Sequence, residues 1–417
     1  MDDRTPIFTS KLVHGAGILV GAAFVANFLA QPFRTFRVQP WAGDFDAFGG
    51  AGRLLLQGDG HLLYSPAAQA AAESAYTGVH LGGGQLFVNP AAAAALLAPL
   101  MELPFHTALV VFTVGSIACV GLSAFLLLRV VLRCPLISTS GLVVIVATAS
   151  VASGWNLVMA NWDCLLLLCL TCAILALQAQ RPLAAGVLLS ILFIKPQLIW
   201  LAPIFLLMAS QWRVLLGLSI GAVAWVAASV LVTGPAPVLQ GVHLAFTLGA
   251  IQASMGTGIP GLLALLIPRG GVVTVVCLTV GVLAVSLVSW WLREALRADP
   301  ALAIAFGLTL SLLLSPHILP TDLALLGVPI VLWARRAPSA ALWSSLFLSA
   351  AVWPYATGIG SPAEVHFALL PQLVVAGGVA WALIREAATL SASQGPLATL
   401  TSPQRFRRGP LSAADRA

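Results

Sequence analysis

The sequence predicts an all-α polytopic membrane protein. Of its 417 residues, 59% are hydrophobic and only 8% are charged, whereas a soluble domain carries about 25% charged residues. Apolar stretches recur along the whole chain at lengths that suit membrane helices, for which roughly 20 residues cross the bilayer. These stretches lack the alternation of polar and apolar residues that marks barrel strands, so helices are expected.

The first membrane span is expected at residues 13–30. Pro32 should end it, because proline interrupts a helix. No small-residue cleavage site follows, so we interpret this segment as a retained span and not as a signal peptide. Arg4 and Lys11 precede it, and positive residues favour the cytoplasmic side, which places the N-terminus in the cytoplasm.

Residues 31–88 form the only long polar stretch between predicted spans, and we expect them to make the first outer loop. Two short helices, at Leu54–Leu56 and in the Ala-rich segment 66–76, are expected to lie on the membrane surface. The glycines Gly82–Gly84 predict a turn.

The apolar run after Asn89 is too long for one span, and Pro104 divides it. We expect a re-entrant or strongly tilted helix at 90–103 and a full span at about 105–131. This arrangement places Arg129 in the cytoplasm, as the positive-inside rule favours.

Later spans are expected near 139–155, 164–180, 183–195, 197–211, 214–233, 272–291, 301–315, 319–334, 339–356 and 365–384. The total is about twelve spans in one transmembrane module of residues 1–387. A Ser/Pro/Gly-rich cytoplasmic tail of residues 388–417 is expected to be disordered. Both termini then lie in the cytoplasm, and nearly all loop arginines face the same side. The positive net charge therefore does not indicate binding of nucleic acid.

The outer loop contains the candidate catalytic residue, Asp44. A positioned carboxylate can take the proton of an attacking alcohol. From the residues alone, Asp44 could also be a solvated loop acid or the N-cap of a helix beginning near Ala47, and Asp46 competes for either role. Arg53 could hold a sugar or a phosphate, or could extend toward the surface as a snorkelling side chain.

Lys195 lies between two predicted spans of about 13 to 15 residues, which fall short of a hydrocarbon core of roughly 30 Å. It should therefore lie in a depression below the outer surface, where ionisable residues are usually functional. Lys195 could bind a phosphate, with Gln197 beside it. The alternative is a lysine that only anchors the helix end at the interface.

Four more polar residues are expected at the outer ends of spans. Asn161 and Asp163 could line the same cavity or cap the span that begins at Cys164. His317 could donate to a phosphate or orient a carboxylate, and Asp322 could bind substrate or cap its helix. The sequence contains no P-loop, nucleotide fingerprint or metal motif, so a soluble nucleotide-sugar donor is not expected.

Five stretches, taken in order, resemble glycosyltransferase family 87, which belongs to the GT-C superfamily of multi-span enzymes. They are Gly43-Asp44-Phe45 with Ala51-Gly52-Arg53; Leu63-Tyr64-Ser65-Pro66; Asn89-Pro90 with Leu97-Ala98-Pro99-Leu100; Ile194-Lys195-Pro196-Gln197; and Ser315-Pro316-His317 with Asp322-Leu323. The resemblance covers roughly residues 40–385 and implies a GT-C-type helical bundle.

The resemblance implies an inverting transfer of a hexose, expected to be mannose, from a polyprenyl-phosphate sugar to a lipid- or glycan-linked acceptor. The reaction would occur at the outer face of the inner (plasma) membrane, in contact with membrane lipid. Asp44 would be the general base, and Lys195 and His317 would lie beside the donor phosphate. No metal or cofactor is required if these groups stabilise the leaving phosphate.

Two other functions compete with this one. A transporter or flippase of a lipid-linked or small polar substrate would have repeated halves and polar residues near the membrane midplane. Here the polar residues gather at one face, and no half-repeat is visible, which favours the enzyme. A catalytically inactive scaffold is the third possibility, because Phe48-Gly49-Gly50 replaces the aromatic pair usual in the family.

Overall fold

The computed structural model describes residues 7–38, 40, 43–80, 85–251, 255–267, 270–357 and 366–393. Within these ranges the chain is helical and has no strand. The predicted turn at Gly82–Gly84, the position of Arg4 and the predicted disorder of residues 394–417 lie outside the described residues. Residues 388–393, which we expected to belong to the disordered tail, are instead the last turns of a helix.

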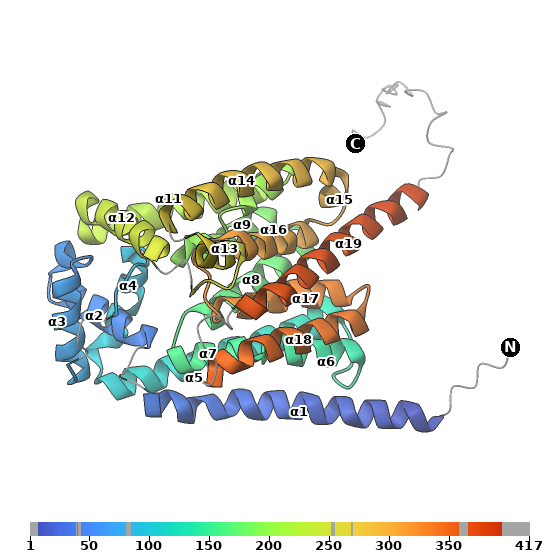
Figure 1. Cartoon of the computed structure of the whole chain (residues 1–417), viewed down its shortest axis with the longest axis horizontal. Coiled ribbons are helices and arrows are strands. Elements are labelled where there is room, and N and C mark those ends of the chain that lie inside the picture. The colour runs from blue at the N-terminus through green and yellow to red at the C-terminus, as the bar shows by residue number, and fades with distance from the viewer. Residues whose placement is uncertain are drawn as a thin grey trace, which may run out of the picture.

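The helices are α1 (Ile7–Val38), α2 (Asp44–Leu56), α3 (Pro66–Thr77), α4 (Ala91–Leu97), α5 (Phe105–Leu126), α6 (Thr139–Thr148), α7 (Val151–Met159), α8 (Asp163–Gln178), α9 (Pro182–Ser190), α10 (Ala202–Met208), α11 (Trp212–Thr233), α12 (Pro235–Ile251), α13 (Ile259–Leu266), α14 (Gly270–Trp291), α15 (Arg293–Ala298), α16 (Pro300–Leu314), α17 (Gly327–Ala334), α18 (Pro338–Thr357) and α19 (Leu369–Ser393). Figure 1 shows α2 and α3 at one end of the molecule and α15 toward the other, with α1, α14 and α19 running lengthwise.

By length and composition, 5 helical segments of the described chain could cross a membrane. They are Gly15–Arg37, Phe105–Leu132, Thr139–Met159, Trp212–Thr233 and His366–Thr389. Six shorter apolar helical segments, of 10–17 residues, accompany them. The predicted all-helical membrane class is therefore confirmed, but the predicted number of about twelve spans is not.

The prediction that Pro32 ends the first helix is wrong, because α1 continues through Pro32 to Val38. Tertiary contacts hold the turns that follow. Thr35 Oγ1 donates to the carbonyl of Leu157 at 2.8 Å, and Arg34 Nη2 donates to the carbonyl of Ala356 at 3.0 Å. The hydrogen bond that proline cannot donate is a local loss, which these contacts to α7 and α18 offset.

The predicted division at Pro104 is confirmed. α4 and the 3-10 helix Ala98–Glu102 precede it, and α5 begins directly after it at Phe105. The short helix predicted at 66–76 is α3. The other short helix is much longer than expected, since α2 begins at Asp44. Between the spans predicted at 214–233 and 272–291, the chain forms α12, for which no helix was predicted.

At three places near the centre of the molecule, a break in the α-helical backbone separates two successive helices. Between α9 and α10 the chain forms two 3-10 helices, Ile191–Ile194 and Pro196–Leu198, on either side of Lys195. The second interruption separates α6 from α7, and the third, between α16 and α17, contains the 3-10 helix Asp322–Leu326. These interruptions place polar side chains and loop backbone inside an otherwise apolar bundle.

Candidate active site

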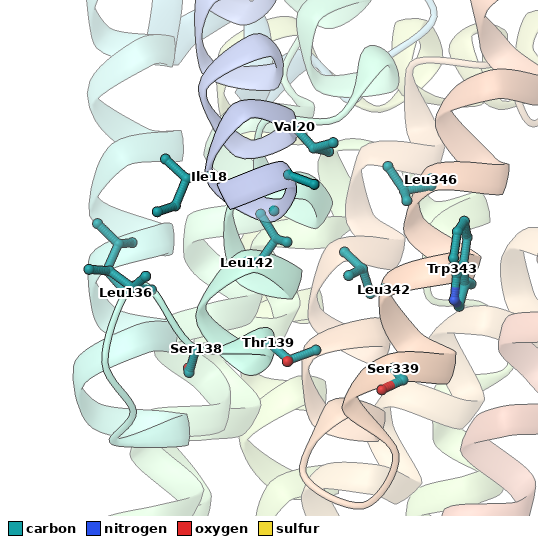
Figure 2. Close-up of a pocket in the computed structure, with 13 residues that line it drawn as sticks. Ile18, Val20, Leu136, Ser138, Thr139, Leu142, Ser339, Leu342, Trp343 and Leu346 are labelled. Atoms are coloured by element: carbon teal, nitrogen blue, oxygen red, sulfur yellow. The ribbon is translucent and has the colours of Figure 1, made fainter. Parts of the chain in front are cut away.

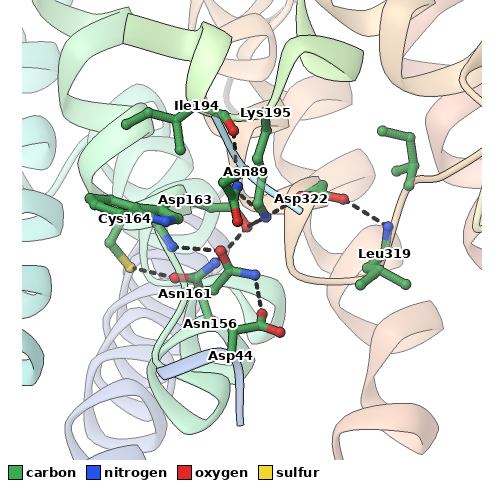
Figure 3. A network of polar contacts seen from close by, with 12 residues as sticks. Asp44, Asn89, Asn156, Asn161, Asp163, Cys164, Ile194, Lys195, Leu319 and Asp322 are labelled. Carbon is green, nitrogen blue, oxygen red and sulfur yellow. Dashed lines mark hydrogen bonds and ion pairs between the residues drawn. The ribbon is translucent and has the colours of Figure 1, made fainter. Parts of the chain in front are cut away.

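The Lys195 ammonium lies between two buried carboxylates. Its Nζ is 3.0 Å from each carboxylate oxygen of Asp163 and 2.7 Å from Oδ1 of Asp322 (Figure 3). Lys195 is 7% exposed, and both acids are buried. Charges at such depth are stable only when paired, and the three donors of an ammonium match these three oxygens.

Local backbone geometry brings these residues together. Pro196 disfavours the helical conformation at the residue before it, and Lys195 has a non-helical backbone with φ −128° and ψ 81°. Asp163 is the first residue of α8, and Asp322 begins the 3-10 helix after α16. The second oxygen of Asp322 accepts a hydrogen bond from the backbone N–H of Leu319 at 2.8 Å, so Asp322 both fixes its own loop and pairs with Lys195.

Two asparagines to which the sequence assigned no role, Asn89 and Asn156, support this group. Asn156 Nδ2 donates to Asp163 Oδ2 at 2.7 Å, and the Cys164 thiol donates to Asn156 Oδ1 at 3.4 Å. Asn89 Nδ2 donates to the carbonyl of Ile194 at 2.9 Å, beside Lys195. A polar amide in an apolar stretch is itself a signal of function, and Asn156 is such a residue.

Asp44 joins the same region from the outer loop. Its Oδ2 accepts a hydrogen bond from Asn161 Nδ2 (Figure 3), and Asn161 Oδ1 accepts one from the backbone N–H of Trp162 at 2.6 Å. Asp44 is not the N-cap of α2, a position that Gly43 occupies. Ala160 has a left-handed backbone with φ 50°, which is costly for a residue other than glycine and lets the chain turn from α7 to Asn161.

The surroundings of Asp44 raise its pKa. Burial raises the pKa of this carboxyl to about 6, a rise that nearby Lys195 and the Asn161 hydrogen bond oppose and Asp322 reinforces. A general base works best when its pKa is near the working pH. At neutral pH Asp44 is therefore mostly ionised and is a stronger base than an ordinary aspartate.

Asp46, the competing acid, lies in a different environment. It is fully buried, and burial together with the nearby Glu73 raises its pKa to about 7. Glu73 belongs to α3, and its Oε2 accepts a hydrogen bond from the backbone N–H of Gln85 at 2.7 Å. Since positions i and i+2 of a helix do not share a face, Asp44 points toward Asn161 while Asp46 faces α3.

His317 lies near the Lys195 group, as the sequence predicts. Its backbone N–H donates to Ser315 Oγ at 3.4 Å, and the charges of Asp322 and Lys195 act on its ring. Burial is the main cause of the lowered pKa of His317. Its buried Nδ1 has no hydrogen-bond partner among the described residues and is therefore available to a ligand.

Two predicted residues are not brought into this group. Arg53 Nη1 donates to the carbonyl of Met101 at 3.4 Å, and its guanidinium lies 5.9 Å from the ring centre of Tyr76. Gln197 is partly exposed and makes no hydrogen bond within the described part of the chain. The described ranges contain no group of three or more His, Cys, Asp or Glu arranged to hold a metal ion.

Comparison with known families identifies one match. The family model described as glycosyltransferase family 87 matches residues 87–316. The matched region includes Asn161, Asp163 and Lys195, whereas Asp44 and Asp322 lie outside it. No curated protein and no solved structure matches the chain.

Proposed function

Since this chain belongs to glycosyltransferase family 87, we propose that it transfers a hexose from a polyprenyl-phosphate sugar to a lipid- or glycan-linked acceptor. Membership makes it a membrane glycosyltransferase with a sugar donor and an acceptor. We further propose that the sugar is mannose, that polyprenyl phosphate carries it, and that the transfer inverts the anomeric configuration. The proposed place of reaction is the outer face of the cytoplasmic membrane. The observation that supports the proposed reaction is the position of Asp44, a buried carboxylate held by Asn161 near Lys195.

In the proposed reaction, the acceptor hydroxyl gives its proton to the Asp44 carboxylate. The hydroxyl oxygen attacks the anomeric carbon, while the bond between that carbon and the phosphate oxygen breaks. The electron pair of this bond leaves with the polyprenyl phosphate. A single displacement inverts the anomeric configuration, and a positioned base contributes roughly 10²–10⁴-fold to such a step.

The other polar residues have separate proposed roles. Asn161 orients the Asp44 carboxylate, and the positive charge of Lys195 helps to keep that carboxylate ionised. The unpartnered Nδ1 of His317 supports a contact with the donor. Lys195 is bound on three sides by carboxylate oxygens, so its proposed role is to hold Asp163 and Asp322 together at the site.

The test of this proposal is the Asp44→Asn variant. The amide cannot accept the proton, so we expect transfer to fall by at least about 10²-fold while the protein still folds and inserts. Membranes containing the variant would be supplied with labelled polyprenyl-phosphate mannose, and transfer to endogenous acceptors would be measured.

Asp59→Asn is the matched control. Asp59 is another acid of the outer loop, and its side chain makes no hydrogen bond with the described residues. We expect this variant to keep full activity. Wild-type transfer by Asp44→Asn would remove Asp44 as the base, and absence of transfer by the unmodified chain would refute the donor.

A further inference from the structure

An apolar groove follows α1 along the side that faces α6, α7 and α18. Its first part has a volume of about 340 Å³ and lies between Val20, Leu142 and Leu342 (Figure 2). Its second part, of about 440 Å³, shares Leu346 with the first and continues to Trp353. We call these two parts together the α1 groove. Both are lined mainly by hydrocarbon, as the site of a lipid chain would be.

A narrow polar recess adjoins the end of the α1 groove that lies toward α2. Asn27 and Trp353 line both the groove and the recess. Gln31 and Arg34 line the recess but not the groove. Arg34 uses one donor on the Ala356 carbonyl and one, at 3.4 Å, on Gln31 Oε1. A guanidinium has five N–H donors, so others remain for a ligand.

Arg34 is also free of ion pairs with the described residues. No carboxylate lies within ion-pair distance of it in the ranges that the structure describes. Lys195, by contrast, is neutralised by Asp163 and Asp322. A leaving phosphate needs a cation or several donors, and Arg34 can supply both.

Helix α7 connects the recess with the reaction centre. Trp155 lines the recess, and the next residue, Asn156, holds Asp163. The Trp155 ring meets the ring of Tyr355 at a centroid distance of 5.9 Å, and Tyr355 is within electrostatic reach of Asp44. The recess is therefore linked to the buried acids through α7 and to Asp44 through Tyr355.

We propose that Arg34 binds the phosphate of the lipid-linked donor and that the α1 groove holds its polyprenyl chain. This inference rests on the proposed function and identifies where its donor binds. Guanidinium and phosphate pair through two parallel hydrogen bonds. The recess is narrow, so the phosphate sits at its mouth, beside Trp353, which is 47% exposed.

Binding of undecaprenyl phosphate, which carries no sugar, tests this proposal without relying on catalysis. The full-length protein would be purified in detergent, and its affinity would be measured by native mass spectrometry. We expect Arg34→Gln to weaken binding at least tenfold. Arg34→Lys should weaken it less, since lysine keeps the positive charge but cannot form the two parallel hydrogen bonds. Arg37→Gln is the matched control, because Arg37 is exposed on the same helix and should not matter.

A second pair of variants tests the α1 groove as the site of the polyprenyl chain. Ala23 lines the α1 groove, so Ala23→Trp should block it and weaken binding. Ala22→Trp, on an exposed position outside the groove, should not. Undecaprenol, which lacks the phosphate, should bind equally well to wild type and Arg34→Gln, and more weakly to Ala23→Trp.

The possible outcomes separate this inference from the proposed function. If wild type binds undecaprenyl phosphate and Arg34→Gln binds it equally well, the Arg34 site is refuted and the donor class stands. Displacement of the ligand by an equal concentration of phosphatidylglycerol would also refute it, since the recess would then accept any lipid phosphate. If wild type does not bind undecaprenyl phosphate, the proposed function fails at its donor.

Discussion

Among individual residues, Lys195 has the largest influence on the buried acids. Asp163 and Asp322 would repel each other at such a depth without an intervening cation, and the ammonium contacts both. Among the described residues, Asp44 is linked to this group through Asn161 and through space, and not by a direct ion pair. A proton acceptor must gain and lose a proton in every cycle. Asp44 can do so without breaking an ion pair.

Lys195→Met is expected to destabilise the protein by about 3–5 kcal/mol, because it leaves two buried carboxylates without a positive charge to pair with. Thermal unfolding in detergent would measure the loss. The double variant Lys195→Met/Asp163→Asn should recover part of it, since one of the uncompensated charges is then removed. Full stability of the single variant would show that the ion pairs contribute nothing.

The activity of the enzyme should depend on the ionisation of Asp44. Since a base works only when deprotonated, kcat/KM should fall as the pH drops through about 6, the raised pKa of this carboxyl. Asn161→Ala removes a hydrogen bond that favours the charged form, so the fall should begin at higher pH. Profiles of kcat/KM against pH for both proteins would check this.

The control for that experiment is Asp59→Asn, whose profile should coincide with that of wild type. A fall in wild-type activity near pH 4, the range of an ordinary aspartate, would contradict the assigned environment of Asp44.

At the level of helices, close packing of α9 against α11 fixes the segment that carries Lys195. Gly186 and Gly217 face each other at this contact, and a Cβ added to Gly186 would collide with the backbone of Val214. Small residues allow such an approach between membrane helices. The position of the interruption at Lys195 therefore depends on glycine, which has no side chain, at both 186 and 217.

Gly186→Ala should force the two helices apart and destabilise the protein by about 1–3 kcal/mol. Gly115→Ala is the matched control, because a Cβ there would meet nothing within 4 Å. It should be neutral or slightly stabilising, since alanine favours a helix over glycine. Unfolding midpoints in detergent would compare the two, and equal midpoints would show that α9 and α11 can separate freely.

For the whole molecule, arginines mark the end opposite α2 and α3. Arg293 lies 4.8 Å from the ring centre of Trp290, and Arg385 lies 5.1 Å from that of Trp381. Arg336 pairs with Glu386 at the junction of α17 and α19. Tryptophan is enriched at both membrane interfaces and arginine on the cytoplasmic side, so the cytoplasmic location of this end stays a prediction.

Cysteine labelling would test that orientation. A cysteine placed at Gln57, exposed in the outer loop, should react with an impermeant maleimide on intact cells, and one at Arg181 should react only after permeabilisation. The native cysteines are buried or partly buried, and the unsubstituted chain gives their background. The reverse pattern would place the Asp44 site in the cytoplasm.

Local sequence patterns predicted the helical class, the division at Pro104 and the interruption at Lys195, because apolar run length and proline act over a few residues. Long-range partners were not predictable. Lys195 and Asp322 are 127 positions apart, so the neutralisation of Lys195 became visible only in the fold. For the same reason the continuation of α1 past Pro32, which depends on contacts with α7 and α18, was missed.

The separation of the three ion-paired residues also matters for synthesis. Asp163 precedes Lys195 by 32 positions and Asp322 follows it by 127. At about 5–20 residues per second, Asp322 leaves the ribosome roughly 6–25 seconds after Lys195. During this interval Asp163 has already been synthesised and Asp322 has not. Asp163 is therefore the acid that accompanies Lys195 into the bilayer. Asp322 arrives later and completes the ion pairs of Lys195.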